Sequence, residues 1–70
     1  MELEIEYWVD EDARDFGLGE MYLGNIIDIE DGKRIVDSIV DITGYASAEL
    51  LLDGEVIYGR DEYSTWGEEK

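Results

Sequence analysis

Apolar and polar residues alternate in the first segment of the chain. Over residues 2–9, one side carries only apolar side chains, at Leu3, Ile5, Tyr7 and Val9. The other side carries Glu2, Glu4, Glu6 and Trp8. A period of two residues is typical of a β-strand with one face in a core. Residues 20–30 alternate similarly, with Ile26 as the exception, and predict a second strand.

Two segments carry helix signals. Residues 10–16 are predicted to form a short helical turn that Asp10 caps and Gly17 ends. Residues 33–43 fit a helix with one apolar stripe, capped by Asp31 and ended by Gly44. Two facts argue against the helix, because the segment is rich in β-branched residues and Lys33 and Arg34 lie at its positively charged end. The pair Asp31-Gly32 is also typical of a hairpin turn, so a strand over these residues is the alternative. We favour the helix because it separates apolar from polar positions more cleanly.

The pair Asp53-Gly54 predicts a two-residue hairpin between strands at 46–52 and 55–59. Such a turn pairs Leu50 with Ile57 and Leu51 with Val56, and paired residues share a face. The expected core face carries Ala48, Leu50, Leu52 and Ile57. The expected opposite face carries Glu49, Leu51, Val56 and Tyr58.

These elements predict an α+β fold in a single domain spanning 1–70. A mainly antiparallel, four-stranded sheet would have one helix (about 33–43) on one face. The alternative, if 33–43 is a strand, is an all-β five-stranded meander. The tail is polar and is expected to be partly flexible from about residue 64, with Tyr63 and Trp66 as possible anchors.

The charge of the chain is strongly one-sided. Twenty acidic residues against five basic ones give a net charge of −15. Nucleic acids and membrane surfaces carry the same sign, so direct binding to either is not expected. The start of the chain is acidic and no apolar run approaches the roughly 20 residues that span a bilayer. A soluble, cytoplasmic protein is expected.

The residue types argue against catalysis. The chain has no histidine and no cysteine, which removes the commonest general base and the usual activated nucleophiles. Gly17-Leu18-Gly19 is too short for a phosphate-binding loop. The acidic segments starting at Asp10 and Asp28 do not match the ligand spacing of a calcium loop. We therefore expect no enzyme activity, no cofactor and no dedicated metal site.

The predicted strand phases gather acidic and aromatic residues on the sheet face away from the helix. Carboxylates repeating every ~7 Å along a strand are comparable to the phosphates of a nucleic acid. Such a face would suit a cationic groove, and aromatic side chains would add apolar anchors. The predicted partner-binding residues are Glu2, Glu4, Glu6, Trp8, Glu20, Tyr22, Asp28, Glu30, Glu49 and Tyr58.

In size, acidity and lack of catalytic residues, the chain resembles phage-encoded DNA-mimic inhibitors of bacterial defence, the anti-CRISPR and anti-restriction proteins. That resemblance implies an inhibitor acting in the host cytoplasm on a basic nucleic-acid-binding protein or nucleoprotein complex. A monomer or weak homodimer is expected. Three alternatives stay open. They are an immunity protein or antitoxin against a basic toxin, a housekeeping domain of a salt-loving organism, and a subunit that docks through Leu51, Val56 and Tyr58.

Overall fold

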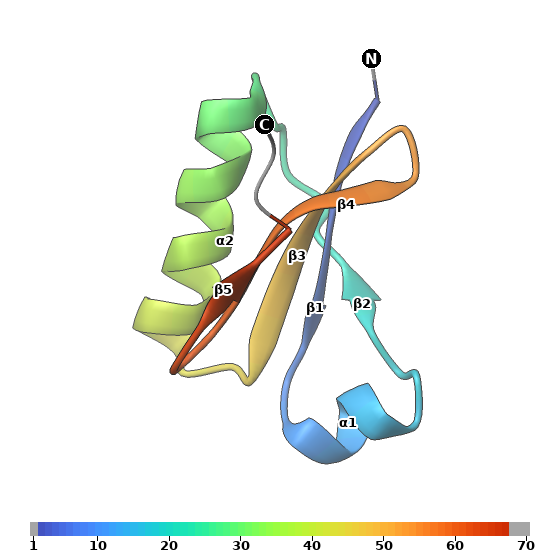
Figure 1. Ribbon diagram of the computed structural model, residues 1–70, viewed down its shortest axis with the longest axis vertical. Helices are drawn as coiled ribbons and strands as arrows, with labels where there is room; N and C mark the ends of the chain where they lie inside the picture. The colour runs from blue at the N-terminus through green and yellow to red at the C-terminus, as the bar shows by residue number, and fades with distance from the viewer. Residues whose placement is uncertain (1, 68–70) are drawn as a thin grey trace.

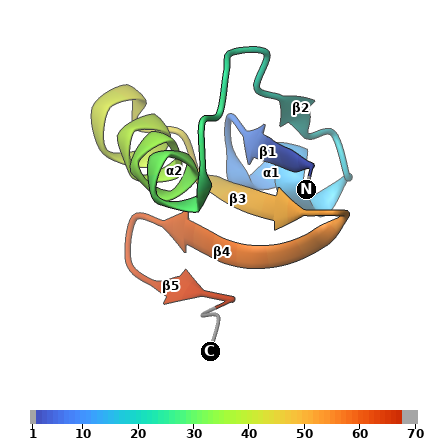
Figure 2. The same ribbon diagram turned by 90° about the horizontal axis from the view of Figure 1, so that it is seen from above.

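The computed structural model describes residues 2–67 and has an α+β architecture. A five-stranded antiparallel sheet has the strand order β2-β1-β3-β4-β5, and α2 lies across one of its faces (Figures 1 and 2). The elements in chain order are β1 (Leu3–Trp8), α1 (Glu11–Asp15), β2 (Glu20–Met21), α2 (Ile29–Thr43), β3 (Ser47–Leu52), β4 (Glu55–Asp61) and β5 (Thr65–Trp66). The predicted α+β fold with one helix covering an antiparallel sheet is confirmed, and the all-β alternative is wrong. The sheet has five strands rather than the predicted four, because β5 (Thr65–Trp66) pairs with β4.

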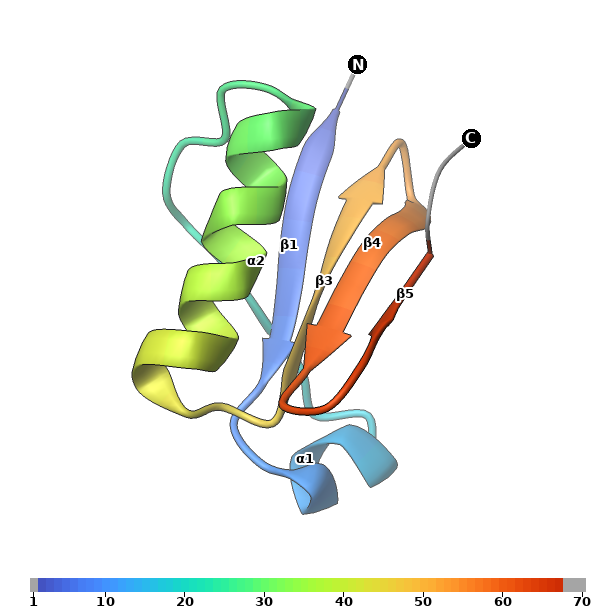
Figure 3. The ribbon, with the colours of Figure 1, turned by 60° about the vertical axis from the view of Figure 1, so that its left-hand side comes forward.

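The core lies between α2 and the inner strands. Figure 3 shows α2 running alongside β1 and β3. The sheet contributes Ile5, Ala48 and Leu50, each with no exposed surface, and the helix contributes a buried stripe of Ile35, Val36 and Val40. These three residues and the partly buried Ile39 belong to the apolar stripe that the sequence predicts, whereas Ile42, the fifth member of that stripe, is 80% exposed. Burial of the other four side chains outweighs the low helix propensity of β-branched residues.

Helix α2 begins four residues before the predicted position. Asp28 is the N-cap, and its Oδ1 accepts a hydrogen bond from Asp31 N at 2.8 Å. Asp31, the predicted cap, instead lies in the first turn, accepts a bond from Ile27 N and pairs with Arg34. The predicted strand over 20–30 is therefore wrong beyond Met21. The predicted end at Gly44 is confirmed, because this residue has a φ of 75° and its N–H reaches Val40 O.

Helix α1 is short but closed at both ends. Ala13 N donates to Asp10 Oδ1 at 2.8 Å, which confirms the predicted cap. At the other end Leu18 N donates to Ala13 O and Gly17 N to Arg14 O, with Gly17 at a φ of 71°. These two bonds form a Schellman motif, which holds the chain in a defined path toward β2.

The hairpin between β3 and β4 has the predicted turn and a different register beyond it. Asp53 and Gly54 both have positive φ, as a type I′ turn requires, and Leu51 pairs with Val56 as predicted. The register then shifts, so that Leu50 pairs with Tyr58 rather than with Ile57. Ile57 is the extra residue of a β-bulge. Tyr58 therefore faces α2, and its predicted place on the opposite face is wrong.

The end of the described chain is attached to the sheet through Trp66. Strand β5 pairs Trp66 with Gly59, and the indole Nε1 donates to Glu49 Oε2 at 2.8 Å. The predicted anchor Trp66 is thus confirmed, whereas Tyr63 is exposed. The part of the predicted flexible tail at 68–70 lies outside the described residues.

A candidate partner-binding surface

The sheet face opposite α2, called here the outer face, is not the open acidic strip that the sequence predicts. An arginine and two tryptophans cover its centre. Arg14 reaches back from α1 and lies 5.4 Å from the Trp8 ring centroid and 4.8 Å from that of Trp66. Its Nη2 is 3.9 Å from Glu49 Oε2. Trp8 is only 8% exposed, so neither Trp8 nor Glu49 is open to a partner as predicted.

Two acidic residues lie directly opposite each other on this outer face. Glu6 of β1 pairs with Glu49 of β3, and like charges at such positions destabilise a sheet. Arg14 places a positive charge beside Glu49. Gly19 passes so close to the Glu6 carboxylate and the Trp8 indole that a Cβ at this position would force one of these side chains to move. The loop before β2 therefore shields Glu6, and Glu4 is the carboxylate of this face that stays exposed.

The other predicted residues lie elsewhere. Glu20 pairs with Tyr7, which places it on the α2 side of the sheet, and Tyr22 packs against the core. Tyr58 donates a hydrogen bond to Asp37 of α2 at 2.7 Å. The remaining three are Glu2, just before β1, Asp28 at the helix cap and Glu30 in the first helical turn. The strand misassigned at 20–30 and the bulge in β4 explain these differences.

Aspartates and glutamates have different roles in this fold. Most aspartates bind the chain itself, as helix caps, in turns or with arginine, namely Asp10, Asp28, Asp31, Asp37, Asp41, Asp53 and Asp61. The short side chain suits bonds to nearby backbone N–H groups. Within residues 2–67, the exposed glutamates make no side-chain hydrogen bond or ion pair, namely Glu2, Glu4, Glu11, Glu20, Glu30, Glu55 and Glu62. These seven glutamates, together with the exposed Asp12 and Asp15, are thus the charges that a partner can meet.

The bonds made by the aspartates lower their proton affinity. Backbone hydrogen bonds from Tyr63 and Ser64 hold the pKa of Asp61 below its ordinary value. The pKa of Asp41 is lowered by its hydrogen bonds with Arg60, whose own pKa is raised by the same contact. Arg60 Nη2 lies 2.6 Å from Asp41 Oδ1, so β4 is tied to α2 by a two-pronged ion pair.

The basic residues of the described chain are all engaged with the chain's own side chains. Arg14 stacks on Trp8 and Trp66, and Arg34 pairs with Asp31. Arg60 binds two aspartates of α2, and Lys33 lies 5.6 Å from the Tyr58 ring centroid. Each of these positive charges therefore lies beside an acidic or aromatic side chain of the same chain, even where it is exposed, as Arg34 is at 71%. The exposed charges without such a partner are acidic.

One segment combines this charge with exposed apolar side chains. Residues 9–21, called here the α1–β2 segment, include Phe16 at 76% and Leu18 at 65% exposure. The exposed apolar residues of the segment are Val9, Phe16, Leu18 and Met21. Between them lie the exposed acids Glu11, Asp12, Asp15 and Glu20. Our sequence interpretation missed this segment, although apolar residues in a short glycine-containing loop, outside any periodic element, were the available signal.

The remaining observations concern known proteins, membranes and metals. No family model, no curated protein and no solved structure matches this chain. No helix within residues 2–67 is long and apolar enough to cross a membrane. Over the same residues, no cluster of three or more acidic side chains is arranged to hold a metal ion.

Proposed function

We propose that this chain is a non-enzymatic inhibitor that binds a positively charged, nucleic-acid-binding surface of another protein and blocks it. A bacterial defence complex of the kind countered by anti-CRISPR and anti-restriction proteins is the proposed target class. The single observation that supports the proposal most strongly is that the basic side chains are paired within the chain itself. Every basic side chain of residues 2–67 contacts an acidic or aromatic side chain of the same fold, while the exposed glutamates stay unpaired.

The proposed contact is the α1–β2 segment. Long-range attraction between opposite charges speeds association and selects a basic partner, but it adds little affinity by itself in salt. Affinity in protein interfaces comes mainly from a few apolar anchors that become fully buried. Phe16 and Leu18 are candidates for such anchors, because they are exposed beside Asp12 and Asp15 and the Schellman motif at Gly17 fixes their backbone.

The test uses immobilised protein and a nuclease-treated bacterial lysate. Captured proteins are eluted first with a short DNA duplex and then with high salt. The proposal expects nucleic-acid-binding proteins in the DNA eluate, and their retention is expected to fall as salt rises. Capture that DNA cannot displace would contradict nucleic-acid mimicry and favour another kind of acidic binder, such as an antitoxin.

A matched pair of variants locates the contact. The test variant combines Glu11→Gln, Asp12→Asn, Asp15→Asn and Glu20→Gln. The control variant carries Glu2→Gln, Glu4→Gln, Glu30→Gln and Glu55→Gln. Each removes four negative charges, so both change the net charge from −15 to −11. Equal loss of capture in both variants would mean that overall charge, rather than the α1–β2 segment, makes the contact.

A second pair tests the apolar anchors. Phe16→Ser should weaken capture about tenfold or more, as expected for a buried interface anchor. Ile42→Ser is the matched control, because Ile42 is equally exposed, at 80%, but lies near the end of α2. Unchanged capture by the Phe16 variant would remove this residue from the proposed interface.

A further inference from the structure

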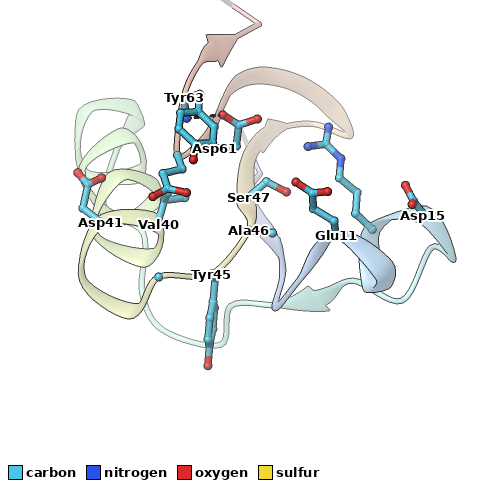
Figure 4. A pocket seen from close by; sticks show the side chains of 12 residues that line it. Glu11, Asp15, Val40, Asp41, Tyr45, Ala46, Ser47, Asp61 and Tyr63 are labelled. Carbon is cyan, nitrogen blue, oxygen red and sulfur yellow. Dashed lines mark hydrogen bonds between the residues drawn. The ribbon is translucent and has the colours of Figure 1, made fainter.

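A concave pocket of about 420 Å³ opens at one end of the molecule (Figure 4). Its walls come from α1, the last turn of α2, the loop before β3 and the turn after β4. Tyr45 and Tyr63 stand at its margin, and Tyr45 is stacked on Tyr7 with ring centroids 5.6 Å apart. The pocket thus combines segments that are distant in the sequence.

Acidic groups dominate the lining. Five carboxylates against one guanidinium, that of Arg14, give a formal lining charge of −4. The carboxylates are Glu11, Asp15, Asp41, Asp61 and Glu62. Arg14 is directed to the two tryptophan rings of the outer face, and Asp41 is paired with Arg60. The side chains of Glu11, Asp15 and Glu62 make no hydrogen bond or ion pair within residues 2–67.

The end of α2 adds further negative potential. Gly44, its C-cap, lines the pocket, and the last turn of the helix contains no basic residue. The last carbonyl groups of a helix carry partial negative charge and favour a nearby cation. The helix end and the unpaired carboxylates therefore both favour a positively charged group in the pocket.

Ser47 supplies an independent observation that indicates a ligand. This residue is only 1% exposed and lines the pocket, and its Oγ has no hydrogen-bond partner among the described residues. In the view of Figure 4 its side chain leaves β3 on the side where Glu11 lies. Buried hydroxyl groups are nearly always hydrogen-bonded, because an unsatisfied one is costly. A donor that enters the pocket would satisfy this oxygen.

We propose that the pocket binds the guanidinium group of an arginine side chain presented by a partner protein. A guanidinium is planar and carries five N–H donors in a fixed fork, so it can bond several separated acceptors at once and stack on a tyrosine ring. The lining matches these needs, with carboxylates on opposite walls, a buried hydroxyl and the exposed ring of Tyr63. The proposal rests on the proposed function for the source of the arginine, since basic nucleic-acid-binding surfaces are rich in this residue.

The first experiment titrates the ¹⁵N-labelled protein with N-acetyl-arginine amide and follows backbone amide shifts. Saturable shifts are expected at Ala46, Ser47 and Glu62, and none at Glu55 on the far hairpin. The matched probes are N-acetyl-lysine amide, which keeps the positive charge without the planar group of N–H donors, and N-acetyl-citrulline amide, which keeps the planar shape without the charge. Equal binding of the lysine probe would overturn the assignment to guanidinium, and absence of saturation with arginine would overturn the pocket.

Two variants test the lining. Combined Glu11→Gln and Glu62→Gln should weaken arginine binding about three- to tenfold, as loss of two charge-assisted contacts implies. The matched control is Glu2→Gln with Glu55→Gln, which leaves binding unchanged. Ser47→Ala should weaken binding by a smaller factor while the melting temperature stays the same or rises, because the variant removes an unpartnered hydroxyl. Equal arginine affinity in all three variants would overturn the proposal.

The outcomes separate this inference from the proposed function. If arginine binds in the pocket but the protein captures no nucleic-acid-binding protein, the pocket stands and the inhibitor proposal fails. If capture succeeds and is unaffected by the pocket variants while free arginine does not bind, the inhibitor proposal stands and the pocket fails.

Discussion

Replacing Arg14 by alanine should loosen the outer face and release α1. The guanidinium contacts the rings of Trp8 and Trp66 and lies beside Glu49, so one side chain joins α1 to β1, β3 and β5. None of the residues of α1 is buried. The helix therefore depends on this contact, and on its caps, for its position on the sheet.

The cost can be worked out from the three contacts. Each cation–π contact at an exposed site contributes about 0.5–1 kcal/mol, so the two together give about 1–2 kcal/mol. The ion pair with Glu49 adds less than about 1 kcal/mol, because the Arg14 side chain is 40% exposed and solvent screens it. The expected loss in the free energy of unfolding is therefore roughly 1–2.5 kcal/mol. In a domain of this size that lowers the melting temperature by roughly 5–15 °C.

The assay is urea unfolding followed by far-UV circular dichroism, with amide hydrogen exchange as a local readout. Faster exchange is expected at Phe16 and Leu18, whose N–H groups close the end of α1. Arg14→Met is the control, because it keeps an unbranched chain over the rings and removes only the charge. If Arg14→Ala unfolded at the same urea concentration as the unmodified protein, the assigned role of Arg14 would be refuted.

Three further substitutions test the helix and its charges. Gly32→Ala should lower the free energy of unfolding by about 1–2 kcal/mol, although alanine favours helices. The reason is that the new Cβ would lie 2.6 Å from Leu50 Cδ1 in a filled core, and a rise in melting temperature would contradict this packing. Asp28→Ala should cost about 1 kcal/mol in thermal unfolding, and Asp28→Ser, which keeps a capping oxygen, should cost less. Arg60 holds the pKa of Asp41 below its ordinary value of 3.8, so Asp41 stabilises the fold above that pH and loses this contribution as pH falls through its lower folded pKa. The stability difference between the unmodified protein and Asp41→Asn should accordingly be constant at neutral pH and shrink in acid, and a constant difference down to pH 2 would count against this ion pair.

The parts of the fold that the sequence predicts correctly are those with a local physical signal. Strand β1 follows from strict alternation, and the type I′ turn follows from Asp53-Gly54, where both residues need positive φ. The end of α2 follows from a glycine that can adopt the left-handed conformation. Each of these signals lies within a few residues of the structure that it determines.

The start of α2 was predicted wrongly because exposed apolar residues imitated a strand. Leu23 and Ile27 take alternate positions in the sequence, yet they are 96% and 79% exposed. Alternation indicates a strand only when one face is buried, and here nothing covers either residue within the described chain. Asp28 and Asp31 are both plausible caps, so the local pattern could not choose between them.

The candidate site was only partly predictable for a different reason. The excess of exposed acidic charge is visible in the composition, but its distribution depends on contacts between distant residues. Trp8 was expected to be an exposed anchor, and its burial depends on Arg14 folding back over it and on Trp66 arriving from the other end of the chain. The pocket around Ser47 likewise joins segments that no local pattern relates.

The bulge at Ile57 has a consequence for how this chain tolerates changes in length. Before the bulge, Glu55 and Val56 pair with β3 in the register that the turn sets. After it, the register is shifted by one residue, so that Tyr58 lies opposite Leu50 and reaches Asp37 of α2. Removing Ile57 would keep Val56 opposite Leu51 and Tyr58 opposite Leu50, whereas adding a residue after Tyr58 would turn Arg60 away from its aspartates. The strand should therefore tolerate deletion of Ile57, although this residue packs against the core, better than an insertion directly after Tyr58, a difference that substitutions alone would not reveal.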